Sequence, residues 1–290
     1  MAQIIGGEII SADARQLYKG MPIGTAVPVD SPVKHHLTEI LDPAERTSAL
    51  WWAKKALSVM EMLIAKEITP IIVGGTGLYI KALTDGIFDS PGESFEIRET
   101  LAKRADSGED LHETLSSIDN EAASKIHPNN TVRIIRALEV YYSTEKTITE
   151  HFKSTETLAG DWTFHKFLLV RDRKKLYHRI DQRVISMIDS GWIEETKNLL
   201  QNGISPNSPG MEAIGYRHIV RYLKGELDIS DLIDRISRET RRYAKRQLTW
   251  FRNQKGYEKI DLTETTQEDV VGQIIEYYKS RNFNDVVHDN

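Results

Sequence analysis

Cysteine is absent from this chain of 290 residues. Its absence excludes disulfides, thiolate catalysis and the zinc or iron–sulfur sites that cysteine would build. No apolar run approaches the ~20 residues that a membrane-spanning helix needs, and the N-terminus has neither the basic region nor the apolar stretch of a secretory signal. These absences predict a soluble, cytoplasmic protein with no membrane contact, and we expect it to be a monomer.

An excess of positive charge is also missing. The chain has 38 Lys and Arg against 43 Asp and Glu, which gives a formal net charge of −5. A protein of this charge has no global attraction to nucleic acid, so any RNA binding has to come from a local cluster of cations. The length allows one large domain or two modest ones.

Short apolar runs alternate with helical patterns in the first part of the chain. Residues 8–12 (EIISA) have the composition of a buried strand, and a helix capped by Thr47 or Ser48 follows. Residues 71–73 form the next predicted strand, and residues 78–84 form a short helix. This alternation predicts an α/β fold with a parallel sheet.

The pattern changes after Asp85. Residues 93–152 are polar and helical in pattern, whereas residues 167–170 (FLLV) again have the composition of a buried strand. Everything beyond Lys174 has a helical pattern. We therefore predict an α/β core made of residues 1–84 and 165–290, interrupted by a helical insertion at residues 85–164.

A basic helix is the strongest physical signal in the sequence. Residues 238–252 contain six cations and one anion, which gives a local charge of +5 in an acidic chain. At about 100° per residue the cations share one face of the helix, opposite its aromatic and apolar side chains. Such a face can follow a row of phosphates, although most charged helix faces are simply solvated.

Three further features allow both a functional and a structural interpretation. Asp13 directly follows a predicted strand, where α/β sheets bind ligands, but an aspartate there can also cap a turn. The turn Gly74–Gly77 allows backbone amides to approach an anion, and tight-turn geometry explains these glycines equally well. The adjacent His35 and His36 are poor metal ligands, and we expect them to be structural.

An ordered set of seven motifs resembles the tRNA dimethylallyltransferases, also called tRNA isopentenyltransferases. No single motif is decisive, but together they extend across nearly the whole chain in the order of that family. The matching segments are residues 10–26 (ISADARQLYKGMPIGTA), 35–43 (HHLTEILDP), 72–79 (IVGGTGLY), 127–130 (HPNN), 136–139 (RALE), 212–217 (EAIGYR) and 245–252 (KRQLTWFR).

The resemblance implies a P-loop-NTPase-like parallel sheet core with a helical insertion domain that contacts the anticodon stem-loop of tRNA. It implies transfer of a dimethylallyl group from dimethylallyl diphosphate to the exocyclic amine of the adenosine 3′ of the anticodon. Asp13 matches the proposed general base, and Mg²⁺ is the implied cofactor. Arg179 and Arg183 are candidate diphosphate ligands, unless they pair with Asp181 or Glu194.

By the same resemblance, residues from six segments contact the tRNA. They are Asp13, Ala14, Arg15, Gln16, Thr76, Arg98, Val132, Arg133, Ile134, Ile135, Arg136, Glu212, Ala213, Ile214, Gly215, Tyr216, Arg217, Lys245, Arg246, Gln247, Leu248, Thr249, Trp250, Phe251 and Arg252.

The sequence departs from the family at its start and at three positions. The family's first strand and P-loop are absent before Asp13, so we expect little or no transfer by this chain. A non-catalytic tRNA-binding remnant is therefore the alternative function, and a small-molecule kinase is a third. Ala14, Val27 and Glu212 replace the serine, lysine and glutamine common in the family, and we expect Glu212 to weaken RNA contact.

Overall fold

The computed structural model describes residues 1–88, 94–155, 157–160 and 162–285. The chain forms two compact units, which we call the core unit (Met1–Ile80 with Asp161–Asn290) and the helical unit (Lys81–Gly160). The sequence placed the two boundaries at residues 84 and 164. No helix in the described ranges is long and apolar enough to cross a membrane.

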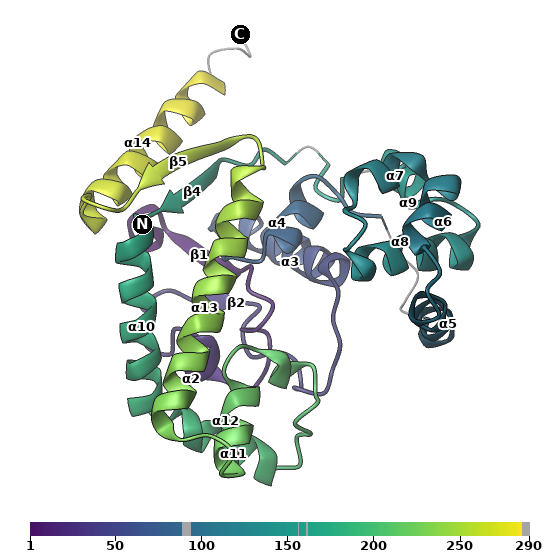
Figure 1. The fold of residues 1–290 in the computed structure, drawn as a ribbon. Coiled ribbons are helices and arrows are strands. Elements are labelled where there is room, and N and C mark those ends of the chain that lie inside the picture. Colours follow the sequence, from purple (N-terminus) through teal and green to yellow (C-terminus); the bar gives the residue numbers. More distant parts are fainter. Residues whose placement is uncertain (89–93, 156, 161, 286–290) are drawn as a thin grey trace. The chain divides into compact units, whose positions relative to one another are not determined.

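A three-stranded parallel sheet lies at the centre of the first half of the core unit (Figure 1). A short helix, α1 (Ala2–Ile5), leads into the middle strand β1 (Gly7–Ser11), which pairs with β2 (His35–His36) on one side and β3 (Thr69–Val73) on the other. Within the described residues β3 is an edge strand. An edge position tolerates Pro70, which has no N–H to donate to a further strand.

Helix α3 (Ala49–Ile64) packs against β1 and β3. It begins where the sequence predicts, because the Ser48 hydroxyl accepts a hydrogen bond from the Trp51 N–H at 3.1 Å. Trp52 is fully buried, and its indole N–H donates to the Ser11 carbonyl at 2.9 Å. Its ring also stacks on Tyr79 of α4 (Gly77–Thr84), with ring centroids 5.1 Å apart. Trp52 therefore fixes the carboxyl end of β1.

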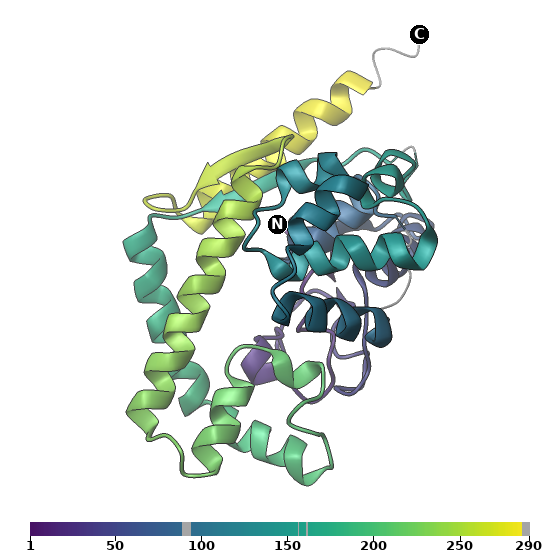
Figure 2. The same cartoon turned by 45° about the vertical axis from the view of Figure 1, so that its right-hand side comes forward.

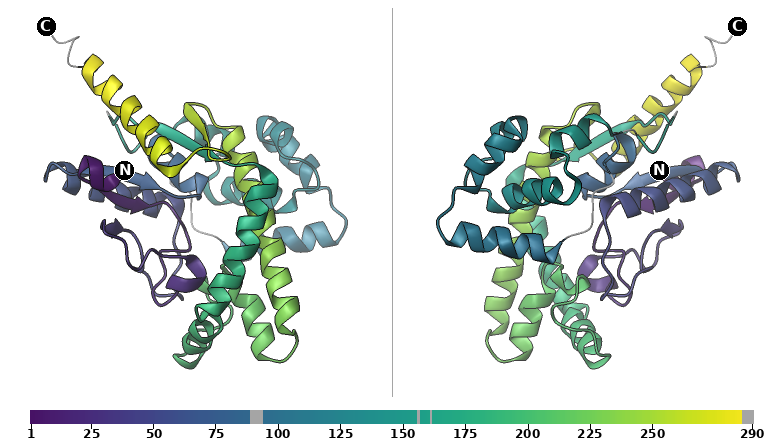
Figure 3. Two further views of the ribbon diagram at one scale, coloured as in Figure 1. Left: turned by 90° about the vertical axis from the view of Figure 1, so that its left-hand side faces the viewer. Right: turned by 90° about the vertical axis from the view of Figure 1, so that its right-hand side faces the viewer.

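A second sheet joins β4 (Lys166–Val170) to β5 (Tyr257–Asp261) in parallel. Helix α14 (Gln267–Asp285) lies along this sheet, with Tyr277 edge-to-face on Phe167 (Figure 3). The prediction that everything beyond Lys174 is helical was wrong at β5. Its sequence YEKID has no apolar run, and it forms a strand because β4 supplies the hydrogen-bonding partner.

Four helices build the rest of the core unit (Figure 2). Helices α10 (Arg173–Asp189) and α13 (Ile229–Arg252) run side by side, and α12 (Tyr216–Leu223) packs against both α11 (Trp192–Gln201) and α13. A single 3₁₀ turn, Gly210–Glu212, precedes α12. The parallel strands and flanking helices confirm the predicted α/β class.

The helical unit has its own hydrophobic core. Helices from both halves of the unit meet around buried leucines, among them Leu101, Leu115 and Leu138. Side chains cap all five helices given below at their N-termini, which satisfies backbone N–H groups that have no partner within the helix. The helices are α5 (Phe95–Asp106), α6 (Leu111–Ile118), α7 (Asn120–Lys125), α8 (Thr131–Thr144) and α9 (Ile148–Lys153).

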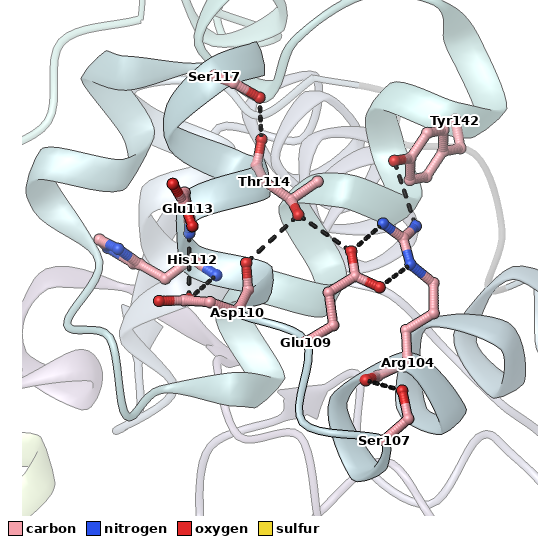
Figure 4. A network of polar contacts seen from close by, with 9 residues as sticks. All are labelled: Arg104, Ser107, Glu109, Asp110, His112, Glu113, Thr114, Ser117 and Tyr142. Carbon is pink, nitrogen blue, oxygen red and sulfur yellow. Dashed lines mark hydrogen bonds and ion pairs between the residues drawn. The ribbon is translucent and has the colours of Figure 1, made fainter.

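Polar contacts also tie the helices of this unit together (Figure 4). Arg104 at the end of α5 donates through Nε to Glu109 at 2.7 Å and reaches the Tyr142 hydroxyl of α8 at 3.5 Å. The Thr114 hydroxyl of α6 donates to the same glutamate at 3.3 Å. Arg104 and Glu109 together therefore link α5, α6 and α8.

Candidate active site

Asp13 lies in the turn that follows β1. Its Oδ1 accepts a hydrogen bond from the Arg15 N–H at 2.8 Å, which closes a small turn. No hydrogen bond from the described residues reaches Oδ2. The structural and functional interpretations of Asp13 are therefore compatible, because one carboxylate oxygen shapes the turn while the other stays available to a ligand.

The glycine turn is attached to the Asp13 turn. The Thr76 N–H donates to the Ala12 carbonyl at 3.0 Å, and the Thr76 hydroxyl accepts the Ala14 N–H at 3.0 Å. A Cβ on Gly74 would lie only 2.2 Å from the Ala12 oxygen. Gly74 is thus required by the close approach of two backbone segments, and no ligand is needed to explain it.

Helix α13 packs against the other side of the glycine turn. The Gln247 amide donates to the Gly75 carbonyl at 3.0 Å. A Cβ on Gly75 would lie 2.0 Å from Gln247 Nε2, and one on Gly77 would lie 2.1 Å from Trp250 Nε1. These two glycines therefore bring the helix close to Asp13, a role that the sequence analysis did not foresee.

The opposite face of α13 carries the cations. Among the described residues, Arg242, Lys245, Arg246 and Arg252 are exposed and have no acidic partner. Arg241 differs from the predicted stripe, because it turns toward α10 and forms an ion pair with Asp181. Arg238 is exposed but pairs with Asp234 at 3.8 Å. The basic stripe is therefore defined as the four exposed cations of residues 238–252 without an acidic partner, Arg242, Lys245, Arg246 and Arg252.

The negative charge of Asp13 helps to raise the pKa of two tyrosines. Burial raises the pKa of Tyr79 to about 12, and Asp13 contributes to the same shift. Burial also raises the pKa of Tyr243 on α13, and Asp13 is the second cause. Both phenols therefore keep their protons at neutral pH and can act as hydrogen-bond donors beside the carboxylate. Sequence spacing gave no signal for either, since only the fold brings them to Asp13.

Several residues that were predicted to contact tRNA instead form hydrogen bonds inside the protein or are buried. Gln16 uses its amide internally, because Nε2 donates to the Thr25 and Ala26 carbonyls while Oε1 accepts the Ser11 hydroxyl. Tyr216 is fully buried and Ala213 is 3% exposed. Buried side chains cannot touch RNA, so they support the exposed residues of the same segments. Ile134, Leu248 and Phe251 are also turned partly or fully inward.

The charged side chains of the 3₁₀ turn Gly210–Glu212 and of the start of α12 have partners elsewhere in the core unit. Arg15 donates to the Pro209 carbonyl at 2.8 Å and lies 3.7 Å from Glu212. Arg217 lies 3.3 Å from Glu239 on α13. Glu212 was expected to weaken RNA contact, but in the structure Arg15 compensates its charge.

A groove of about 850 Å³ runs between α10 and the segment around α2 (Pro22–Thr25). Arg179 and Arg183 form its polar wall, and neither has an acidic partner among the described residues. The acids considered as their partners pair elsewhere, Asp181 with Arg241 and Glu194 with Lys197. The facing wall is apolar and consists of Pro22, Ile23, Ala26, Val27 and Val29.

A partly buried carboxylate holds that apolar wall in place. Glu195 of α11 accepts the Ile23 N–H at 2.7 Å and the Gly24 N–H at 3.0 Å. The Tyr216 hydroxyl donates to the same carboxylate at 2.7 Å. Burial raises the pKa of Glu195 despite these three donors. The sequence gives no signal for Glu195, because its position in a helical pattern reveals nothing about partners that lie far away in the chain.

In the helical unit, Glu139 likewise accepts a backbone N–H and holds a neighbouring segment in place. It is fully buried, and it accepts the Ser94 N–H at 2.7 Å and contacts Arg98 at 3.0 Å and Arg136 at 2.6 Å. Burial alone would raise the pKa of Glu139, but Arg136, the Ser94 N–H and Arg98 outweigh it and hold the pKa below its usual range. Two of the predicted tRNA-contacting arginines are thus anchored, while Arg133 is exposed.

The described residues do not fit a protein-held metal ion. No three His, Cys, Asp or Glu side chains come together within those ranges. The neighbouring histidines have other contacts, since His36 pairs with Glu8 and His35 hydrogen-bonds Ser31 at 3.0 Å. A hard cation such as Mg²⁺ needs oxygen ligands, and Asp13 is not accompanied by the other acids such a cluster needs.

Known proteins resemble the chain over most of its length. The model of the IPP transferase family matches residues 16–254. The chain is 42% identical to the tRNA dimethylallyltransferase of Pelotomaculum thermopropionicum over 260 residues, which cover 88% of this chain and 82% of that protein. It is 41% identical to the tRNA dimethylallyltransferase of Thermotoga petrophila over 280 residues, which cover 95% of this chain and 89% of that protein.

Solved structures of tRNA prenyltransferases are also similar to this chain. The tRNA isopentenylpyrophosphate transferase of Bacillus halodurans is 34% identical with a TM-score of 0.71, covering 99% of this chain and 92% of that one. A eukaryotic dimethylallyltransferase acting on tRNA is 27% identical with a TM-score of 0.74, and the match covers 98% of this chain and 74% of that one. The similarity therefore includes the core unit and the helical unit alike.

The glycine turn supplies a matched pair of substitutions. We expect Gly74→Ala to lower the free energy of unfolding by about 3 kcal/mol, because its Cβ meets the rigid backbone at Ala12. Gly75→Ala should cost only about 1 kcal/mol, since the flexible end of Gln247 can move aside. Urea denaturation of both variants measures the difference, and equal losses would contradict it.

Glu195 should matter far more than its neighbour. Glu195→Ala leaves the Ile23 and Gly24 N–H groups without their acceptor and removes the nearer of two acceptors of the Tyr216 hydroxyl, so we expect the free energy of unfolding to drop by about 3 kcal/mol. Glu194→Ala, the matched control, removes only an exposed pair and should cost less than about 0.5 kcal/mol. Thermal or urea unfolding checks both values.

The same residue predicts a pH dependence. Because the folded protein raises the pKa of Glu195, the stability linked to this group is present below its ordinary pKa and is lost as pH rises through the folded value. In Glu195→Gln this loss should disappear from the stability profile. An unchanged difference between acidic and neutral pH in that variant would show that other groups cause it.

Proposed function

Because the chain belongs to the IPP transferase family, we propose that it transfers a dimethylallyl group from dimethylallyl diphosphate to tRNA. The acceptor is the exocyclic amine of the adenosine on the 3′ side of the anticodon. The family match confirms the resemblance found in the sequence, and it favours a transferase over the small-molecule kinase considered above.

One observation carries this proposal: a carboxylate with an uncommitted oxygen lies at the end of a parallel strand, beside a helix with unpaired cations. Asp13 is the carboxylate, and the docking of Gln247 on Gly75 brings α13 to it. A general base for a neutral amine needs such an oxygen within hydrogen-bond reach. The basic stripe on the same helix supplies charge for the RNA backbone.

The chemical step is a displacement at an allylic carbon. The adenine amine is a poor nucleophile, because its lone pair is delocalised into the purine ring. As the new nitrogen–carbon bond forms and the carbon–oxygen bond to diphosphate breaks, Asp13 takes the proton from the amine. The neutral phenols of Tyr79 and Tyr243 can donate hydrogen bonds next to this carboxylate and help to orient it.

The groove beside α10 supports a site for the donor. Arg179 and Arg183 are one helical turn apart and can contact the diphosphate, and as it leaves they stabilise its growing negative charge. The apolar wall from Pro22 to Val29 suits a short hydrocarbon chain. Val27 adds apolar surface where the family commonly has lysine, so the two arginines carry the charge in this groove.

The tRNA contacts divide between the two units. In the core unit, the basic stripe on α13 can contact phosphates, whereas the exposed Arg217 is paired with Glu239. In the helical unit, Arg98, Arg133 and Arg136 can do so, and their clustering supports a contact with the anticodon stem-loop. A cytoplasmic location, a monomeric state and the use of Mg²⁺ remain predictions, and no step above depends on them.

Replacing Asp13 with asparagine should separate chemistry from binding. Asp13→Asn keeps the shape and the Arg15 hydrogen bond but loses the base, so we expect prenyl transfer to fall by about 10²–10⁴-fold. The affinity for tRNA should change by less than about threefold. Transfer of labelled prenyl group under single-turnover conditions gives the rate, and filter binding gives the affinity.

Asp106→Asn is the control for that experiment, because Asp106 is exposed at the end of α5 and lies outside the proposed site. It should leave the transfer rate unchanged. Undiminished transfer by Asp13→Asn would rule out Asp13 as the base. Absence of transfer by the unsubstituted chain, with tRNA binding intact, would instead favour the non-catalytic remnant.

Two sets of cations should affect two different substrates. The double substitution of Lys245 and Arg246 to Ala should weaken tRNA binding and reduce its salt dependence by about one unit of slope per lost phosphate contact. Substituting Arg179 and Arg183 with Ala should raise KM for dimethylallyl diphosphate and leave the tRNA affinity unchanged. Lys224→Ala, an exposed cation at the end of α12, controls for net charge. A donor KM that depends on the first pair would contradict this division.

A further inference from the structure

The two most exposed large apolar side chains of the described residues lie in the helical unit. Phe95 is 81% exposed and Val132 is 80% exposed. Single exposed apolar residues are common on protein surfaces and need no explanation. These two are unusual because both lie in the first turn of a helix, Phe95 in α5 and Val132 in α8.

Both side chains flank the same buried anchor. Glu139 accepts the N–H of Ser94, the residue before Phe95, and it contacts Arg98 one turn further along α5. It also contacts Arg136, which lies one turn after Val132 on α8. Glu139 therefore fixes the start of α5 against α8 and places two arginines close to the two exposed apolar groups.

The charges around this surface favour an anionic polymer with flat, unpaired rings. Arg133 is exposed between Val132 and Arg136 and has no acidic partner among the described residues. Two acids lie near Phe95 in the sequence of α5: Glu99 is paired with Lys103 at 2.8 Å, and Glu96 is exposed in the first turn of the helix. The N-termini of both helices add a partial positive charge. An aromatic ring beside cations is the combination that binds single-stranded nucleic acid.

We propose that Phe95, supported by Val132, stacks on an unpaired nucleobase of the tRNA anticodon loop while the arginines anchored by Glu139 contact the neighbouring phosphates. This inference rests on the proposed function and names a contact within it. Phe95 is then a residue that determines which loop sequences bind well, because purines stack over a larger area than pyrimidines.

The test uses an anticodon stem-loop RNA with 2-aminopurine placed in turn at each unpaired loop position. Stacking on an aromatic ring quenches its fluorescence, so one position should be quenched on binding by the unsubstituted protein. In Phe95→Ala that quenching should vanish, and the affinity for the stem-loop should fall about 5- to 150-fold. Phe95→Trp restores a stacking ring and should keep both signals.

Ile64→Ala controls for the loss of exposed apolar surface, since Ile64 lies at the end of α3 and is 51% exposed. It should bind the stem-loop normally. Unchanged quenching and affinity in Phe95→Ala, with Lys245 and Arg246 still required for binding, would overturn this inference and leave the proposed function standing. If the unsubstituted protein does not bind the stem-loop at all, the proposed function fails with it.

Discussion

The docking of α13 on the glycine turn is the contact on which the candidate site depends. Gln247 donates to the Gly75 carbonyl, and the indole of Trp250 occupies the space that a side chain on Gly77 would need. This contact turns one face of the helix toward Asp13 and leaves the basic stripe exposed. Without it the carboxylate and the cations would belong to separate parts of the core unit.

The distribution of ion pairs explains how an acidic chain can offer basic surfaces. Cations near structural joints are matched, such as Arg15 with Glu212, Arg217 with Glu239 and Arg241 with Asp181. Those of the basic stripe, together with Arg179 and Arg183 in the groove, have no acidic partner in the described ranges. Surface ion pairs contribute little to stability, so unmatched cations cost the fold little and remain available to phosphates.

The sequence predicted those parts of the fold whose signals are local. The Ser48 cap, the strand that ends at Ser11 and the cationic face of α13 each depend on residues within a few positions of one another. Strand β5 was missed because its formation depends on β4, nearly ninety residues away in the chain. Asp13 was found in the same local way, since a strand end can be recognised from the strand itself.

The match to the family's motifs did not distinguish exposed residues from buried ones. It grouped exposed residues such as Arg217 and Val132 with buried ones such as Tyr216 and Ile134, because a motif records neighbours in sequence and not the direction of side chains. Glu195, Tyr243 and Phe95 gave no sequence signal for the opposite reason. Their roles come from partners that lie far away in the chain or from an exposure that only the folded unit reveals.

Two glutamates, one partly and one fully buried, make similar contacts but have different charged neighbours. Glu195 and Glu139 each accept backbone N–H groups at the start of a helix and so fix the position of that segment. Glu139 also faces two arginines, and its pKa lies below the usual range, whereas Glu195 has only neutral donors and its pKa is raised. Burial disfavours the charged form in both cases, and only nearby cations reverse that effect. The anchor in the helical unit is therefore firm down to acidic pH, while the wall of the groove depends on a carboxylate whose ionisation the fold itself opposes.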